Sequence, residues 1–182
     1  MTRSFDAGVD WLQVRERSGD TATLLEIVDL ACSAARPAKR PARVIVNRRL
    51  DVALAAGADG VHLGFDAVPP GHARTLLGSE AVVGFSAHAP EELARTPDIS
   101  YAHLAPIFDP LSKPAERPAL GLAVLRKAAR HGVPVLAQGG IDLEHARPAI
   151  EAGASGVAIT GLLSSASDPS GPARALREIL DV

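Results

Sequence analysis

The stretch Ala56-Gly57-Ala58-Asp59-Gly60-Val61-His62-Leu63 decides the fold, because it combines the end of a helix, a glycine turn and an apolar strand. A glycine just past a helix accepts the left-handed backbone that the turn needs. Similar phrases stand at 7–14, 131–136 and 152–159, and the four glycines lie 49, 75 and 21 residues apart. These intervals are about two, three and one times a unit of ~24 residues, the length of one strand, one helix and two loops.

The segments between these phrases complete an alternating pattern. Apolar runs predict strands near 9–15, 43–47, 60–64, 81–86, 100–107, 133–138 and 156–160. Helices are predicted near 21–35, 49–56, 70–77, 90–95, 121–131, 143–152 and 172–180. Strict alternation predicts a parallel sheet covered by helices. We therefore expect an α/β chain, a (β/α)8 TIM barrel in one domain over residues 1–182, apparently lacking its first strand. An open doubly wound sheet is the alternative.

The front of the chain looks incomplete, because residues 1–8 read as the tail of a helix with no strand before it. Either the true start codon lies upstream or the barrel is open at this seam. Unpaired strand edges at an open seam would favour a homodimer.

The composition limits the partners and the location. The 182 residues carry 19 basic and 21 acidic side chains, a net charge of −2, which gives no reason to expect nucleic acid or an anionic membrane as partner. No apolar run approaches the ~20 residues that cross a bilayer. The single Cys32 cannot form an internal disulfide, and the start has no apolar secretory segment, so we expect a cytoplasmic protein.

Polar residues recur on one alternating face near the carboxyl ends of the predicted strands. In a parallel barrel this end carries the active site. Their recurrence over several strands predicts a binding pocket rather than isolated core residues. The set is Gln13, Arg15, Asn47, His62, Ser86, His88, His103 and Gln138.

The last two loops predict an anion site. Gly139-Gly140-Ile141 ends one strand, and Thr160-Gly161 follows the next strand as the start of a short helix. In barrels of this kind these loops bind phosphate through backbone N–H groups, and we expect Gly139, Gly140, Thr160 and Gly161 to do so. The proline-rich loop 109–119 is expected to form a lid that carries Lys113 over the ligand.

Several motifs together resemble the thiamine phosphate synthase/thiazole tautomerase family. They follow in the family's order over nearly the whole chain: Gln13-Val-Arg15-Glu-Arg17-Ser18, the block Asn47 to Gly64, Gly84-Phe-Ser86-Ala-His88, Pro106-Ile-Phe108, Lys113 and Gly139-Gly140-Ile141. The resemblance implies a barrel, a thiazole phosphate or its carboxylate as ligand, and a place in thiamine biosynthesis.

The synthase branch implies a magnesium ion held by two aspartates. In this sequence Arg48 and Ala67 stand at those positions, and the neighbouring Asp66 is expected to face the other way. Magnesium prefers carboxylate oxygens in a strict octahedral shell, so no metal ligand is predicted. The threonine-rich diphosphate loop is also replaced, by Asp109-Pro110-Leu111-Ser112.

The tautomerase branch uses no such metal. Arg15-Glu16-Arg17-Ser18, Ser86-Ala87-His88 and 161–165 resemble this branch, although its acid/base histidine falls at Pro106. We therefore expect His103, helped by Lys113, to be catalytic. The main prediction is a metal-independent thiazole tautomerase-like isomerase without a cofactor. The alternatives are a synthase that couples a pyrimidine diphosphate to thiazole phosphate, with magnesium, and a non-catalytic sensor of the same phosphate ligand.

Overall fold

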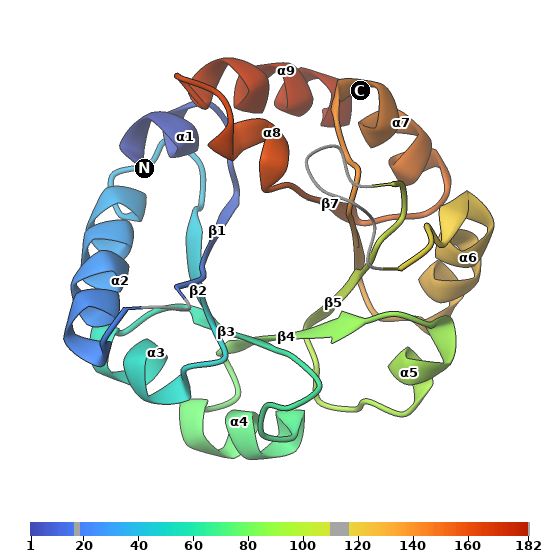
Figure 1. Cartoon of the computed structure of the whole chain (residues 1–182). Coiled ribbons are helices and arrows are strands. Elements are labelled where there is room, and N and C mark those ends of the chain that lie inside the picture. The colour runs from blue at the N-terminus through green and yellow to red at the C-terminus, as the bar shows by residue number, and fades with distance from the viewer. Residues whose placement is uncertain (17–18, 110–116, 182) are drawn as a thin grey trace.

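The computed structural model describes residues 1–16, 19–109 and 117–181, in which strands and helices alternate (Figure 1). The strands are β1 (Trp11–Val14), β2 (Arg43–Asn47), β3 (Gly60–Leu63), β4 (Val82–Ala87), β5 (Tyr101–Leu104), β6 (Val135–Gln138) and β7 (Gly156–Ala158). The helices are α1 (Thr2–Asp6), α2 (Thr21–Ala35), α3 (Leu50–Ala56), α4 (Pro70–Leu77), α5 (Pro90–Ala94), α6 (Gly121–Ala128) with the 3-10 turn η1 (Ala129–His131), α7 (Leu143–Glu151), α8 (Gly161–Ser164) and α9 (Ser170–Leu180).

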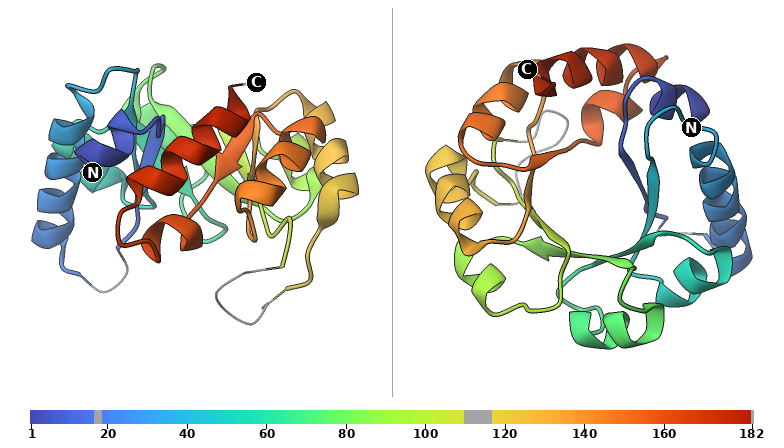
Figure 2. Two further views of the ribbon diagram at one scale, coloured as in Figure 1. Left: turned by 90° about the horizontal axis from the view of Figure 1, so that it is seen from above. Right: turned by 180° about the vertical axis from the view of Figure 1, so that it is seen from behind.

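The strands form one parallel sheet in the order β1-β2-β3-β4-β5-β6-β7. The sheet curls so that its helices lie outside it, which both faces of the molecule show (Figures 1 and 2). This arrangement confirms the curled α/β sheet of barrel type and excludes the doubly wound alternative, whose strand order would reverse. The missing first strand remains a prediction.

Helix ends carry the caps that the sequence supplies. The carboxylate of Asp20 accepts the Thr23 N–H at 2.8 Å and begins α2. Asp142 accepts the N–H groups of Glu144 and His145, both at 2.9 Å, and begins α7. Gly57 ends α3 with a left-handed φ of 61°, as its place in the repeated phrase predicts.

The hydrophobic core has two parts. The larger part lies between the sheet and the helices and is built from side chains such as Val28, Val44, Val61, Leu104 and Leu125. The smaller part fills the inside of the sheet near the amino ends of the strands, with Ile45, Val82 and Tyr101 buried against Trp11 and Leu136.

Gly84 makes room for this inner layer. A Cβ atom at Gly84 would lie 2.3 Å from Cζ of Tyr101, so the tyrosine ring occupies the space that a side chain would need. The Trp11 ring meets Tyr101 edge-on, with 4.9 Å between ring centroids. The amino end of the barrel interior is therefore closed by interlocked aromatic and aliphatic groups.

None of the helices among the described residues is long and apolar enough to cross a bilayer.

Candidate functional site

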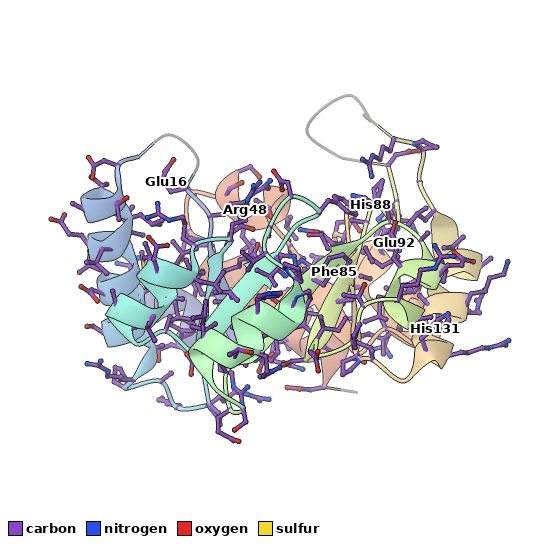
Figure 3. The ribbon with its side chains drawn as sticks, turned by 90° about the horizontal axis from the view of Figure 1, so that it is seen from below. Glu16, Arg48, Phe85, His88, Glu92 and His131 are labelled. Carbon is purple, nitrogen blue, oxygen red and sulfur yellow. The ribbon has the colours of Figure 1, made fainter. Side chains whose placement is uncertain are left out.

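The predicted polar face is present and lies inside the curled sheet. Strand pairing sets Asn47 of β2 beside His62 of β3, and Ser86 of β4 beside His103 of β5. Gln138 ends β6, and Arg15 and His88 follow β1 and β4 directly. Figure 3 shows Glu16, Arg48 and His88 along one edge of the molecule, with His131 toward the opposite edge. The carboxyl ends of the strands thus gather the polar groups, as expected for a barrel.

His62 lies at the centre of a buried hydrogen-bond chain. Its Nδ1 lies 3.0 Å from the Tyr101 hydroxyl, and its Nε2 lies 2.8 Å from Oγ of Ser86. The His103 ring stacks at an angle on His62, with 4.2 Å between centroids. The buried amide nitrogen of Gln13 has no hydrogen-bond partner among the described residues.

Burial keeps both inner histidines neutral. Desolvation lowers the pKa of His62 strongly, and a proton on the neighbouring His103 or the charge of Arg15 would lower it further. Desolvation lowers the pKa of His103 to about 4, against a hydrogen bond with Gln138 that raises it. Burial raises the pKa of the Tyr101 hydroxyl, so this group stays protonated. Near neutral pH this layer is an uncharged hydrogen-bonding surface.

His88 differs from the inner pair because it lies at the mouth of the barrel and is only partly buried. Its Nδ1 lies 2.7 Å from the backbone oxygen of Ala105. A carbonyl only accepts, so Nδ1 carries the proton and Nε2 of the neutral ring is left as an acceptor. The carboxylate of Glu92 accepts the His88 backbone N–H at 2.8 Å and fixes the turn. Among the expected site residues, His88 presents a basic nitrogen closest to solvent.

Arg48 and Asp66 form an ion pair at the same edge. The Arg48 guanidinium donates to Asp66 Oδ2 at 2.6 Å, and this hydrogen bond is the main cause that lowers the pKa of the carboxyl. The expectation that Asp66 faces away is wrong, because Asp66 Oδ1 lies 3.6 Å from where a side chain at Gly64 would begin, on the inward face of β3. The turn after Gly64 brings the carboxylate to Arg48.

These residues do not fit a magnesium ion. The Asp66 carboxylate is already paired with the Arg48 guanidinium, the nearby Asp51 carboxylate is paired with Arg49, and the Ala67 side chain offers no oxygen. The described residues include no group of three or more His, Cys, Asp or Glu side chains that could hold a metal. A hard cation would have to displace a bonded guanidinium to gain a single carboxylate.

The expected phosphate-binding residues follow two neighbouring strands. Gly139 and Gly140 lie after β6 with φ values of 88° and 62°, and Thr160 and Gly161 begin α8 after β7. A Cβ atom at Gly140 would lie 2.4 Å from the Asp109 backbone oxygen, so this glycine lets two loops touch. First-turn N–H groups of a helix lack an acceptor within the helix, and we expect those of α8 to bind an anion. Phosphate binding there remains a prediction.

A surface hollow of about 450 Å³ lies at the other end of the barrel and is lined by Trp11, Arg43, Arg74 and Tyr101 among others. The Arg74 guanidinium donates hydrogen bonds within the protein, to the Ser79 backbone oxygen and to Ser100 Oγ. This hollow is therefore a structural corner at the amino ends of the strands, and we expect the functional site at the opposite end.

Two functional neighbours were not expected from the sequence. Tyr101 lies on the same alternating face as His103, and that alternation could have identified it. The Arg48–Asp66 pair joins two loops, which no periodicity predicts. Lys113 and residues 110–116 of the expected lid lie outside the described residues, so their role stays a prediction.

Comparisons with known proteins agree on one family. The model of the thiamine monophosphate synthase family matches residues 1–163. The thiamine-phosphate synthase of Leptospira biflexa is 35% identical over 93% of this chain and 83% of its own length. That of Albidiferax ferrireducens is 38% identical over 96% and 80%. The solved thiamine phosphate pyrophosphorylase from Pyrococcus furiosus superposes with a TM-score of 0.89 at 27% identity, over 99% of this chain and 87% of that one.

Proposed function

This chain belongs to the thiamine monophosphate synthase family, and from that premise we propose that it is a thiamine-phosphate synthase that binds thiazole phosphate at the barrel mouth. One observation supports this choice over the tautomerase expected from the motifs. Relatives that align over more than nine-tenths of the chain are named synthases. The motifs that favoured the isomerase branch are short by comparison with this similarity.

The reaction joins two rings and releases diphosphate. The bond between the pyrimidine-bearing carbon and the diphosphate oxygen breaks, and the diphosphate leaves with the electron pair. A thiazole ring nitrogen supplies the pair for the new carbon–nitrogen bond. The chain's own contribution is to bind and orient the two rings over a floor, the neutral hydrogen-bonding layer of His62, Tyr101 and His103. It also stabilises the negative charge on the departing diphosphate.

The residues have distinct parts in this proposal. Gln13 offers an unpaired donor from the floor, and Ser86 offers its hydroxyl above His62. Asn47 and His88 line the rim, and the N–H groups around Gly139, Gly140 and Gly161 hold the thiazole phosphate. Because the inner histidines are neutral, they orient ligands rather than carry charge to them.

A second candidate is metal-free proton transfer on thiazole carboxylate phosphate. It is favoured by the accepting Nε2 of His88 at the mouth and by Arg48 and Ala67 at the two positions where the synthase branch implies aspartates. His103, expected to be the acid/base residue, lies in the buried layer with 6% of its surface exposed. His88 is the better placed of the two.

The test is product formation for both reactions on one preparation, in EDTA and in excess magnesium. Thiamine phosphate from the two substrates supports the synthase. Isomerised thiazole without coupling supports the second candidate. Binding of thiazole phosphate with neither product would favour the sensor.

A further inference from the structure

The corner formed by Arg48, Asp66 and Gly64 is unlike the rest of the barrel mouth, because it combines a charged pair with open space. Apart from its chain neighbours Leu63 and Phe65, the only described atom that a Cβ atom at Gly64 would meet within 4 Å is Asp66 Oδ1, at 3.6 Å. Gly64 continues the inward face of His62 at the end of β3. The space in front of Gly64 is therefore available to a ligand that rests on the buried floor.

Arg48 is held in place by its backbone. Its φ is 67°, a left-handed conformation that side chains other than glycine rarely adopt. The Arg48 N–H donates to the His62 carbonyl at 2.9 Å, which ties the residue to β3. Such local strain at a strand end points to a functional constraint.

The ion pair itself is exchangeable. The side chains of Arg48 and Asp66 are 48% and 70% exposed, so solvent screens their attraction. An anion with several oxygens can replace Asp66, because a guanidinium fork binds two oxygens at once.

We propose that Arg48 binds the diphosphate of the pyrimidine substrate directly and takes the place of a metal ion, with Asp66 holding the guanidinium until the substrate arrives. The identity of the ligand in this inference rests on the proposed synthase function. The site itself is inferred from Arg48, Asp66 and Gly64 of this chain. A diphosphate seated in front of Gly64 faces the guanidinium, and the displaced Asp66 carboxylate turns to solvent.

The test uses inorganic pyrophosphate as the probe and calorimetric titration in EDTA. The parent protein is expected to bind it without metal. Arg48→Gln removes the charge but keeps the β-carbon and the backbone strain, and is expected to weaken binding by about 10- to 100-fold. Asp66→Asn removes the competing carboxylate and is expected to tighten binding by about two- to fivefold.

Arg49→Gln is the matched control. Arg49 is the next residue, is also exposed, and also forms a 2.6 Å ion pair, with Asp51. Its guanidinium further donates to Thr21 at 3.0 Å, at the start of α2. This variant should bind pyrophosphate like the parent, and thermal unfolding should show that all variants are folded.

Several outcomes would overturn the inference: no pyrophosphate binding by the parent in EDTA, unchanged affinity in Arg48→Gln, or a saturable Mn²⁺ site in the parent on which pyrophosphate binding depends. The coupling assay separates this result from the proposed function. Arg48-dependent pyrophosphate binding without thiamine phosphate formation would refute the function and leave the site. Thiamine phosphate formation with full pyrophosphate affinity in Arg48→Gln would refute the site and leave the function.

Discussion

The two ends of the barrel interior are built from the same alternating face but from opposite chemistry. At the amino ends of the strands, Trp11, Ile45 and Tyr101 form a tightly packed apolar layer. Two residues further along each strand, polar groups such as Gln13 and His103 take over. The amino end of the barrel interior is filled by packed side chains and leaves no room for a ligand. The carboxyl end presents hydrogen-bond donors and acceptors, and we expect ligands to bind there. Changes at the first end should therefore alter stability, and changes at the second should alter binding.

The largest effect is expected from Gly84→Ala, which adds an atom 2.3 Å from the Tyr101 ring. The ring must move out of its packed position, and the free energy of unfolding should fall by about 2–3 kcal/mol. Urea unfolding measures this loss. Gly171→Ala on α9, where nothing lies within 4 Å, is the control and should not destabilise the protein. Equal stability of the two variants would mean that the apolar end is loosely packed.

The second largest effect is expected from acid, which should lower the free energy of unfolding through the buried histidines. His103 has a pKa near 4 when folded, against an ordinary value of 6.5, because burial disfavours its charge. Below pH 6.5 the unfolded chain binds a proton that the folded chain refuses, so the free energy of unfolding falls as pH falls. Between pH 6.5 and 5.5 the loss should be about 1 kcal/mol per histidine, for His103 and likewise for His62.

Urea unfolding at both pH values checks this dependence. His103→Gln should make it shallower, while His131→Gln, at the 3-10 turn η1, should leave it as in the parent. A parent whose stability does not change over this interval would show that the inner histidines are not desolvated.

A smaller effect on stability, with a larger one on binding, is expected from Ser86→Ala. The variant removes the 2.8 Å partner of His62 Nε2 and should cost about 1 kcal/mol of unfolding free energy. Thiazole phosphate affinity should fall as well, measured by calorimetric titration. Unchanged affinity would separate the hydrogen-bond chain from the ligand site.

The smallest effect is expected at the far rim. Arg43 lies over the Trp11 ring, with 5.8 Å from its guanidinium carbon to the centroid, and is exposed. Arg43→Ala should change the free energy of unfolding by about 0.5 kcal/mol and leave product formation unchanged. Lost activity in this variant would break the division between the two ends.

The sequence predicted the bounds of helices and strands better than it predicted how deeply each site residue is buried. The helices at 21–35 and 70–77 and the strand at 43–47 have the expected bounds, because caps and alternation are local signals. Alternation also indicates which face of a strand is inward, and so identified His62 and His103. It does not tell how deep a residue lies along the barrel axis, and His103 proved buried.

Loop geometry was the weaker part of the prediction. Asp66 was expected to face away, but the turn after Gly64 brings it to Arg48. The partner of such a residue is 18 positions away in the sequence and depends on how two neighbouring strands end. The choice of chemistry stays a prediction: short motifs favoured the tautomerase branch, whereas relatives similar over nearly the whole chain are named synthases.

The chain from Tyr101 through His62 to Ser86 has a consequence for how the mouth treats its ligands. A neutral imidazole has one N–H, so the three groups can align in two opposite directions. In one direction Ser86 donates to Nε2 and offers its oxygen lone pairs to the ligand. In the other, Nε2 donates to Ser86 and the serine proton is free to point at the ligand. A phosphorylated or carboxylated ligand bound against Ser86 would be rich in acceptors, and it would select the second direction and reverse the Tyr101 hydroxyl two groups below. A ligand at this position would therefore set the direction of all the hydrogen bonds from Ser86 to Tyr101.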